Sequence, residues 1–149
     1  MKFMSSLQTL GLLVLRLTLA LIFIYHGYPK LVRADASINE FFVQHGLPAY
    51  LVTVSGILEC FGSLLLFVGL FTRPTSLALA AEMAMAIWKV HSSAGALVVK
   101  EYEFPLSIAA ACFALATTGA GAISFDYLLL GDESSKKHPS SKKPGGWNR

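Results

Sequence analysis

Charged side chains are scarce in this sequence, and their scarcity excludes an ordinary soluble domain. Only 14% of the 149 residues are Asp, Glu, Lys or Arg, whereas 54% are hydrophobic and the mean hydropathy is +0.59. Soluble domains carry about 25% charged residues. The composition is instead typical of a chain that spends most of its length in a lipid bilayer, so we expect an integral membrane protein.

Cysteine is also rare, and the spacings that hold metals or haem are missing. Cys60 and Cys112 stand alone, without a CxxC or CxxCH pair and without histidines at metal-ligand spacing. A Ser-His-Asp set is missing too. We therefore expect no metal site and no cofactor held by the chain itself, and we interpret both cysteines as inert buried thiols.

Four apolar stretches fill most of the chain, at residues 7–28, 50–71, 74–90 and 104–122. Each holds roughly 17–22 residues, which is long enough for a helix to cross a bilayer. They predict an all-α fold, an integral membrane four-helix bundle that uses residues 1–130 as one transmembrane domain and leaves no room for a soluble catalytic module. The first stretch is too long for a signal peptide and lacks a small-x-small cleavage site, so we expect a retained helix.

Proline and glycine predict where these helices end. Pro29 predicts a stop or a kink at the end of the first helix, and Gly119-x-Gly121 predicts the end of the fourth. In the first outer loop, Ser37 and Glu40 have the spacing of a capping box. This spacing predicts a short amphipathic helix on the membrane surface, whose apolar side would consist of Ile38, Phe41, Phe42 and Leu47.

The net charge of +3 is confined to one tail. Residues 131–149 hold five Lys or Arg and two acidic residues, whereas the rest of the chain holds seven of each. Their Ser, Lys, Pro and Gly content predicts a disordered basic tail. Because positive charge stays on the cytoplasmic side, we expect a bacterial inner-membrane, multi-pass protein with both termini in the cytoplasm. Lys30, Arg33 and Lys100, in the outer loops, count against this orientation but are outnumbered by the tail.

Three ionisable residues interrupt the apolar stretches. Arg16, Glu59 and Glu82 each lie in a different predicted helix. With a rise of about 1.5 Å per residue, their distances from the helix ends place all three within roughly 5 Å of one level. Because a charge in hydrocarbon costs about 3 kcal/mol or more, such residues normally face one another. We expect Arg16 to bridge both carboxylates through its planar donors, with the remaining negative charge neutralised by a proton or a cationic partner.

A second polar layer is expected nearer the outer surface. Glu82 and Lys89 are seven residues apart and would share one helical face two turns from each other. The pattern allows three interpretations: an ion-pair network that sets helix register, a redox or ligand pocket, and a transport path. The layer consists of His26, Lys30, Lys89, His91, Tyr102 and Glu103.

Four segments of the chain, in order, resemble the motifs of the DoxX family. Together they cover about residues 11–127. The segments are LRL at 15–17 with FIYHGYPKL at 23–31, GILECFGSLLL at 56–66 with GLFTR at 69–73, EYEFP at 101–105, and TGAGAISFD at 118–126. The resemblance implies a four-helix bacterial inner-membrane protein, similar to the small quinone-reactive subunit of a thiosulfate:quinone oxidoreductase.

Two functions from different classes remain open at this point. The first is a quinone-linked oxidoreductase subunit that works with a redox partner protein or as a homo-oligomer, since the chain holds no electron carrier of its own. The second is a non-enzymatic scaffold or stress-related protein whose buried ion pairs only stabilise the bundle. We expect the lipid bilayer as a partner and no nucleic acid. The candidate ligand-binding residues are Arg16, His26, Lys30, Glu59, Glu82, Lys89, His91 and Glu103.

Overall fold

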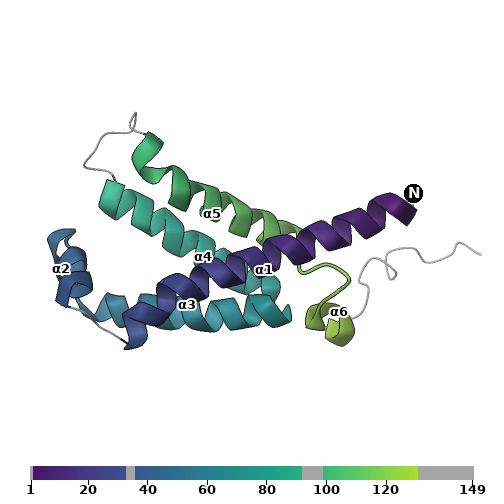
Figure 1. The fold of residues 1–149 in the computed structure, drawn as a ribbon, viewed down its shortest axis with the longest axis horizontal. Coiled ribbons are helices and arrows are strands. Elements are labelled where there is room, and N and C mark those ends of the chain that lie inside the picture. The colour runs from purple at the N-terminus through teal and green to yellow at the C-terminus, as the bar shows by residue number, and fades with distance from the viewer. Residues whose placement is uncertain (1, 33–35, 92–98, 131–149) are drawn as a thin grey trace, which may run out of the picture.

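The computed structural model describes residues 2–32, 36–91 and 99–130, and these are helical with no strand among them (Figure 1). The predicted all-α class is therefore confirmed for this part of the chain. The predicted tail at 131–149 lies outside the described residues. The elements are α1 (Lys2–Val32), α2 (Ala36–Gln44), α3 (Tyr50–Val68), α4 (Thr72–Ala86), the π-helical turn η1 (Ile87–His91), α5 (Val99–Thr118) and α6 (Phe125–Leu130).

Glycines end two of the long helices. Gly69 adopts a left-handed conformation (φ 77°) after α3, and its N–H donates to the carbonyl of Leu65 at 2.8 Å. Gly119, at φ 86°, ends α5 in the same way, as the sequence predicts. A residue without Cβ adopts this conformation freely, which is why helices commonly stop there.

Of the stop or kink predicted at Pro29, the stop is wrong, because α1 continues through the proline to Val32. Proline removes one backbone hydrogen bond from a helix, and here contacts with α3 offset that loss. Lys30 donates a hydrogen bond to Ser55 at 2.8 Å. The side chains of Lys30 and Leu31 also lie directly against Gly56. The additional turn of α1 is therefore held by tertiary contacts.

The long helices pack as two pairs. α1 lies against α3, and α4 lies against α5, while contacts of α3 with α4 and of α1 with α5 join the pairs (Figure 1). α1 and α3 run antiparallel, because Gly27 meets Cys60 near one end and Arg16 meets Gly69 near the other. Small residues bring these two helices into close contact.

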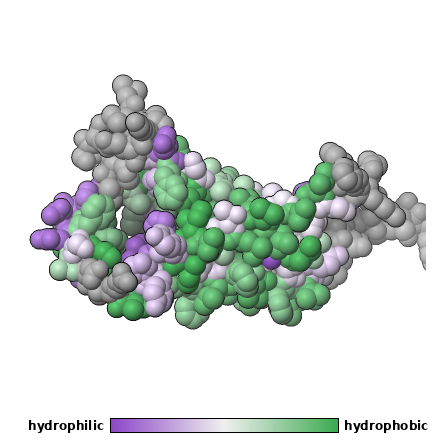
Figure 2. Space-filling view, in the orientation of Figure 1, coloured by the Kyte–Doolittle hydropathy of each residue, from purple (hydrophilic) through white to green (hydrophobic). Residues whose placement is uncertain are grey.

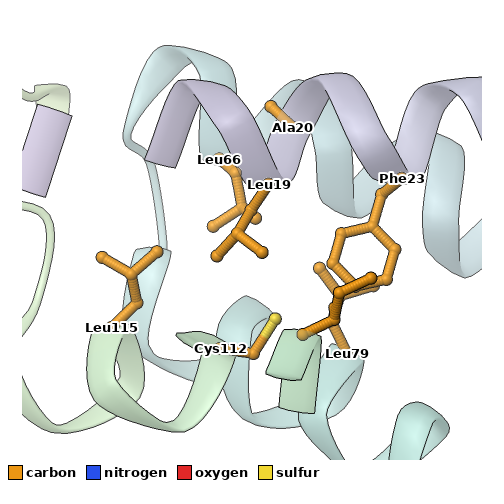
Figure 3. Close-up of a cluster of buried hydrophobic side chains, with 8 residues drawn as sticks. Leu19, Ala20, Phe23, Leu66, Leu79, Cys112 and Leu115 are labelled. Atoms are coloured by element: carbon orange, nitrogen blue, oxygen red, sulfur yellow. The ribbon is translucent and has the colours of Figure 1, made fainter. Parts of the chain in front are cut away.

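Apolar side chains from α1, α3, α4 and α5 meet in a common core (Figure 3). Cys112 is part of it and is completely buried, while Cys60 is half-buried; both are free thiols. The core consists of Leu19, Ala20, Phe23, Leu66, Leu79, Ile108, Cys112 and Leu115.

Two of the described helices are long and apolar enough to cross a membrane, Ser6–Val32 and Tyr50–Val68, and Tyr102–Thr118 forms a shorter apolar helix. In the most apolar stretch of each helix, only 22% of the residues (Ser6–Val32) and 33% (Tyr50–Val68) are buried, whereas the core helices of soluble proteins are mostly buried. Figure 2 shows hydrophobic residues covering the body, with hydrophilic ones gathered at the end that carries α2. Surface of this kind suits contact with lipid. That α1, α3, α4 and α5 all cross the membrane stays a prediction.

Candidate functional site

A chain of polar side chains links α1, α3 and α4 near the C-terminal end of α1. We call it the outer cluster, after the predicted orientation, and it consists of Lys30, Ser55, Glu59 and Glu82. The Lys30 ammonium nitrogen lies 2.7 Å from Glu59 Oε2 and donates a hydrogen bond to Ser55 Oγ at 2.8 Å. The Ser55 hydroxyl in turn donates to Glu82 Oε1. One ammonium group therefore lies between two carboxylates, one bound directly and the other through a serine hydroxyl.

Two glycines allow this arrangement. A Cβ atom added to Gly27 would lie 2.7 Å from Glu59 Cβ and 3.0 Å from the Cys60 backbone nitrogen. A Cβ added to Gly56 would lie 2.9 Å from Lys30 Cβ. Small residues that face each other let two membrane helices approach closely. This close packing brings Lys30 within reach of Glu59 and Ser55.

The site is shielded from solvent at one end and more open at the other. The Glu59 side chain is only 2% exposed, whereas the Lys30 side chain is 19% exposed. A buried charge is tolerated when a partner compensates it, and Lys30 provides that compensation for Glu59.

His26 lies one turn before Lys30 on α1. Its Nδ1 lies 2.9 Å from the carbonyl oxygen of Ile22. Because a carbonyl only accepts hydrogen bonds, Nδ1 carries the proton, and Nε2 of the neutral ring is the acceptor. The ring also packs against Phe104, with the centroids 6.0 Å apart.

A half-open cavity of about 810 Å³ lies beside these residues and is lined by α1, α2, α3 and α4. Its polar lining consists of His26, Lys30, Ser37, Ser55 and Glu82. The rest is apolar: Ile38, Phe41, Phe42, Leu47, Leu51, Val54, Leu58, Ala78, Ala81, Met83, Met85 and Ala86. A large apolar cavity with a few convergent polar groups is the usual form of a small-molecule site.

The predicted cluster of Arg16 with Glu59 and Glu82 is wrong in one member. The structure brings the two glutamates together through Ser55 and Lys30, but Arg16 lies elsewhere. Glu59 is level with Gly27, and Arg16 precedes Gly27 by eleven residues, or about 16 Å along the helix. The depth argument failed because it aligned the helix ends, whereas the contacts of Gly27 and Gly56 set the actual register.

Arg16 belongs to a second polar cluster, which we call the inner cluster after the predicted orientation, near the C-terminal end of α3. Its side chain is 2% exposed, and its Nη1 donates to the carbonyl of Ala120 at 2.9 Å. Gly69 packs on the guanidinium so closely that an added Cβ would lie 2.5 Å from Nη1. These contacts tie α1 to the α3–α4 connection and to the segment after α5.

Asp126 completes this inner cluster and was missed by the sequence analysis. Its carboxylate accepts hydrogen bonds from the backbone N–H groups of Phe71 at 2.7 Å and Thr72 at 2.8 Å. Its own N–H donates to the carbonyl of Gly69 at 2.9 Å. Asp126 thereby caps the N-terminus of α4 and supports Phe71, which has a strained φ of 49°. The signal was available, since Asp126 closes a segment that resembles the family motif.

The remaining predicted site residues lie away from the cavity lining or outside the description. Lys89 is exposed, with its Nζ 5.1 Å from the centre of the Trp88 ring, and Glu103 is also exposed. The side chain of His91 is outside the described residues. The expected shared face of Glu82 and Lys89 is interrupted by η1, because a π turn changes the helical period.

Ser55 is the residue of the outer cluster that the sequence analysis missed. It precedes Glu59 by four residues, so both lie on one face of α3. This spacing was the signal that could have found it. Four apolar side chains were predicted to lie on the membrane surface, and the structure shows that all four line the cavity. Three of them, Ile38, Phe41 and Phe42, belong to α2, and Leu47 follows it.

Helices with exposed apolar surfaces and a buried charged cluster define this molecule as an all-helical membrane protein. The DoxX family model matches residues 11–92, which is more than half of the chain. The chain belongs to the DoxX family.

Several relatives are similar to this chain over most of their length. The inner membrane protein YqjF of Escherichia coli is 30% identical over 85% of this chain and 97% of its own. CatD of Bacillus subtilis, whose name describes a candidate oxidoreductase, is 31% identical over 83% of this chain and 90% of its own. The inner membrane protein YphA of Escherichia coli is 29% identical over 77% of this chain and 87% of its own. No solved structure matches the chain.

Proposed function

We propose that this protein is a quinone-linked redox subunit of the bacterial inner membrane, and that the outer cavity binds the quinone. The observation that carries the proposal is the cavity of about 810 Å³, apolar over most of its wall and polar where His26, Lys30, Ser55 and Glu82 meet. A quinone needs an apolar channel for its tail and hydrogen-bonding groups for its head. The relative CatD, named as a candidate oxidoreductase, supports a redox role.

The polar residues have complementary roles in this proposal. Lys30 has three ammonium protons, and Ser55 and Glu59 engage two of them, so one remains for a quinone oxygen. Nε2 of His26 would accept a hydrogen bond from a hydroxyl group of the reduced quinol. After reduction, the hydroxyl group of the quinol would donate a hydrogen bond to the carboxylate of Glu82. Electrons would come from a partner redox protein, since quinone reduction needs an external donor.

We also propose that α1, α3, α4 and α5 all cross the membrane with both termini in the cytoplasm. The names of YqjF and YphA support an inner-membrane location. In this orientation the cavity and Lys30 lie toward the periplasmic side, while Arg16 and Asp126 lie toward the cytoplasm.

Quinone binding to the full-length protein in detergent tests the proposal. We expect bound quinone in solvent extracts of the purified protein and saturable quenching of tryptophan fluorescence by decylubiquinone. His26→Phe should weaken binding of the reduced form, decylubiquinol, about five- to tenfold, which corresponds to one lost hydrogen bond from a quinol hydroxyl to Nε2. His45→Phe is the matched control, because its Nδ1 bonds a carbonyl oxygen in the same way but the residue does not line the cavity.

The absence of extracted quinone, of saturable binding and of quinone-reductase activity would remove the redox proposal. The alternative is then a non-enzymatic scaffold whose polar residues only hold the helices. The inner cluster favours this alternative, since Arg16 and Asp126 bond backbone groups and stabilise connections.

A further inference from the structure

The charges around the outer cavity are unequal in number. Glu59 and Glu82 provide two carboxylates, and Lys30 is the ammonium group that interacts with both in the described part of the chain. Lys30 lies 2.7 Å from Glu59 and reaches Glu82 only through the Ser55 hydroxyl. With both carboxylates ionised, one negative charge remains uncompensated, and it is centred on Glu82.

Glu82 is also the carboxylate that lines the cavity, whereas Glu59 does not. Ser55 donates to its Oε1, while its Oε2 is buried without a hydrogen-bond partner among the described residues. An uncompensated charge in an apolar environment requires a counter-ion or a proton. Lys89 does not serve, because it lies within the π turn η1, outside the cavity lining, with its Nζ 5.1 Å from the centre of the Trp88 ring.

Aromatic rings line the cavity on the side of α2. Phe41 and Phe42, from α2, line it, with their ring centroids 6.3 Å apart at an interplanar angle of 65°. Aromatic faces attract organic cations, and they recognise quaternary ammonium groups in this way. Met83 and Met85 add polarizable surface that adapts to ligands of different shape. α2 contributes no charged side chain to the lining.

From these observations we infer that the outer cavity binds a lipophilic organic monocation, with Glu82 as its counter-ion and Phe41 and Phe42 as its aromatic contacts. The volume of about 810 Å³ lies in the range of small-molecule sites. Lys30 does not prevent this binding, because Glu59 compensates its charge. The inference does not depend on redox chemistry, since binding a cation transfers no electron.

Equilibrium dialysis of the full-length protein in detergent tests the inference, with tetraphenylphosphonium as the probe and triphenylphosphine oxide as a neutral aromatic comparison. We expect saturable binding of tetraphenylphosphonium. Glu82→Gln should weaken it about ten- to a hundredfold, the effect of losing one charge-assisted contact, and should leave the neutral compound unaffected. Glu40→Gln is the matched control: the same change on an exposed residue of α2 outside the lining should alter binding by less than about twofold.

Phe41→Leu provides a second test that keeps the cavity apolar and all charges intact. It should weaken tetraphenylphosphonium binding about two- to fivefold through loss of the cation–π contact, again without affecting the neutral compound. If the Glu82→Gln variant elutes as an aggregate, the Phe41→Leu variant alone decides whether the inference holds. Equal affinities of the wild type and the folded Glu82→Gln variant, or equal losses for the charged and neutral probes, would overturn the inference. Decylubiquinone titration of the same samples tests the redox proposal separately. A failure of cation binding can therefore be distinguished from a failure of quinone binding.

Discussion

Lys30 is the residue on which the outer cluster depends, because it compensates a glutamate that is almost fully buried. Its nitrogen lies 2.7 Å from Glu59 Oε2, and the Glu59 side chain is 2% exposed. The sequence analysis placed Lys30 in a separate outer layer and gave Glu59 to Arg16. In the structure Lys30, and not Arg16, pairs with Glu59, while Arg16 bonds the carbonyl of Ala120. Each cation therefore stabilises a different end of the molecule.

We expect Lys30→Met to destabilise the protein by about 3–5 kcal/mol, because Glu59 would lose its cation in a low-dielectric environment. The double variant Lys30→Met/Glu59→Gln should recover most of this loss, since no buried charge then remains. Equilibrium unfolding in mixed micelles with sodium dodecyl sulfate measures both. Lys89→Met, a change of the same chemistry at an exposed site, should stay within about 0.5 kcal/mol of the wild type. Additive losses in the double variant would show that Lys30 and Glu59 do not interact.

At the scale of the elements, the close packing of α1 on α3 determines which side chains meet. Gly27 and Gly56 lie in this contact, and the polar cluster forms beside them. Asp126 of α6 has a corresponding role at the other end, where it links the connection between α3 and α4 to the segment after α5. The helices are therefore positioned from both ends.

Gly27→Ala tests the close packing. The new Cβ would lie 2.7 Å from Glu59 Cβ and 3.0 Å from the Cys60 backbone nitrogen, so α1 must move away from α3. We expect a loss of about 1–3 kcal/mol, typical of overpacking. Gly11→Ala is the matched control on the same helix, with nothing within 4 Å of the added Cβ, and should be neutral or stabilise by up to about 1 kcal/mol. Equal effects of the two variants in unfolding experiments would contradict this account.

At the scale of the whole molecule, membrane orientation decides which compartment each polar cluster faces. The basic residues of the tail predict a cytoplasmic C-terminus. If four helices cross, the N-terminus shares that side, and residues 92–100 face the periplasm.

Reporter fusions test this orientation. Alkaline phosphatase fused within residues 92–100 should be active, because it folds in the periplasm, whereas the same enzyme fused at residue 149 should be inactive. Green fluorescent protein at the same two positions should give the opposite pattern. An active phosphatase at residue 149 would overturn the charge argument and invert both polar clusters.

The sequence by itself determined the class of the protein and most of the helices. Apolar runs of sufficient length require internally hydrogen-bonded backbone in lipid, so they predict helices whatever their neighbours are. Gly119 ends α5 as predicted because its backbone freedom is a local property. A short helix in the segment of Ser37 and Glu40 was likewise predicted from local residues, and α2 lies there, although Ser37 is inside the helix and not at its N-cap.

Only the tertiary structure decided which charges meet. The register of two packed helices depends on where their surfaces approach most closely, and equal depth in a membrane does not determine it. Contacts of Gly27 and Gly56 placed Glu59 beside Lys30 and left Arg16 about 16 Å away along α1. The same contacts carried α1 past Pro29, against its local preference. Helix formation is a local property of this chain, whereas the charged site arises from packing between helices.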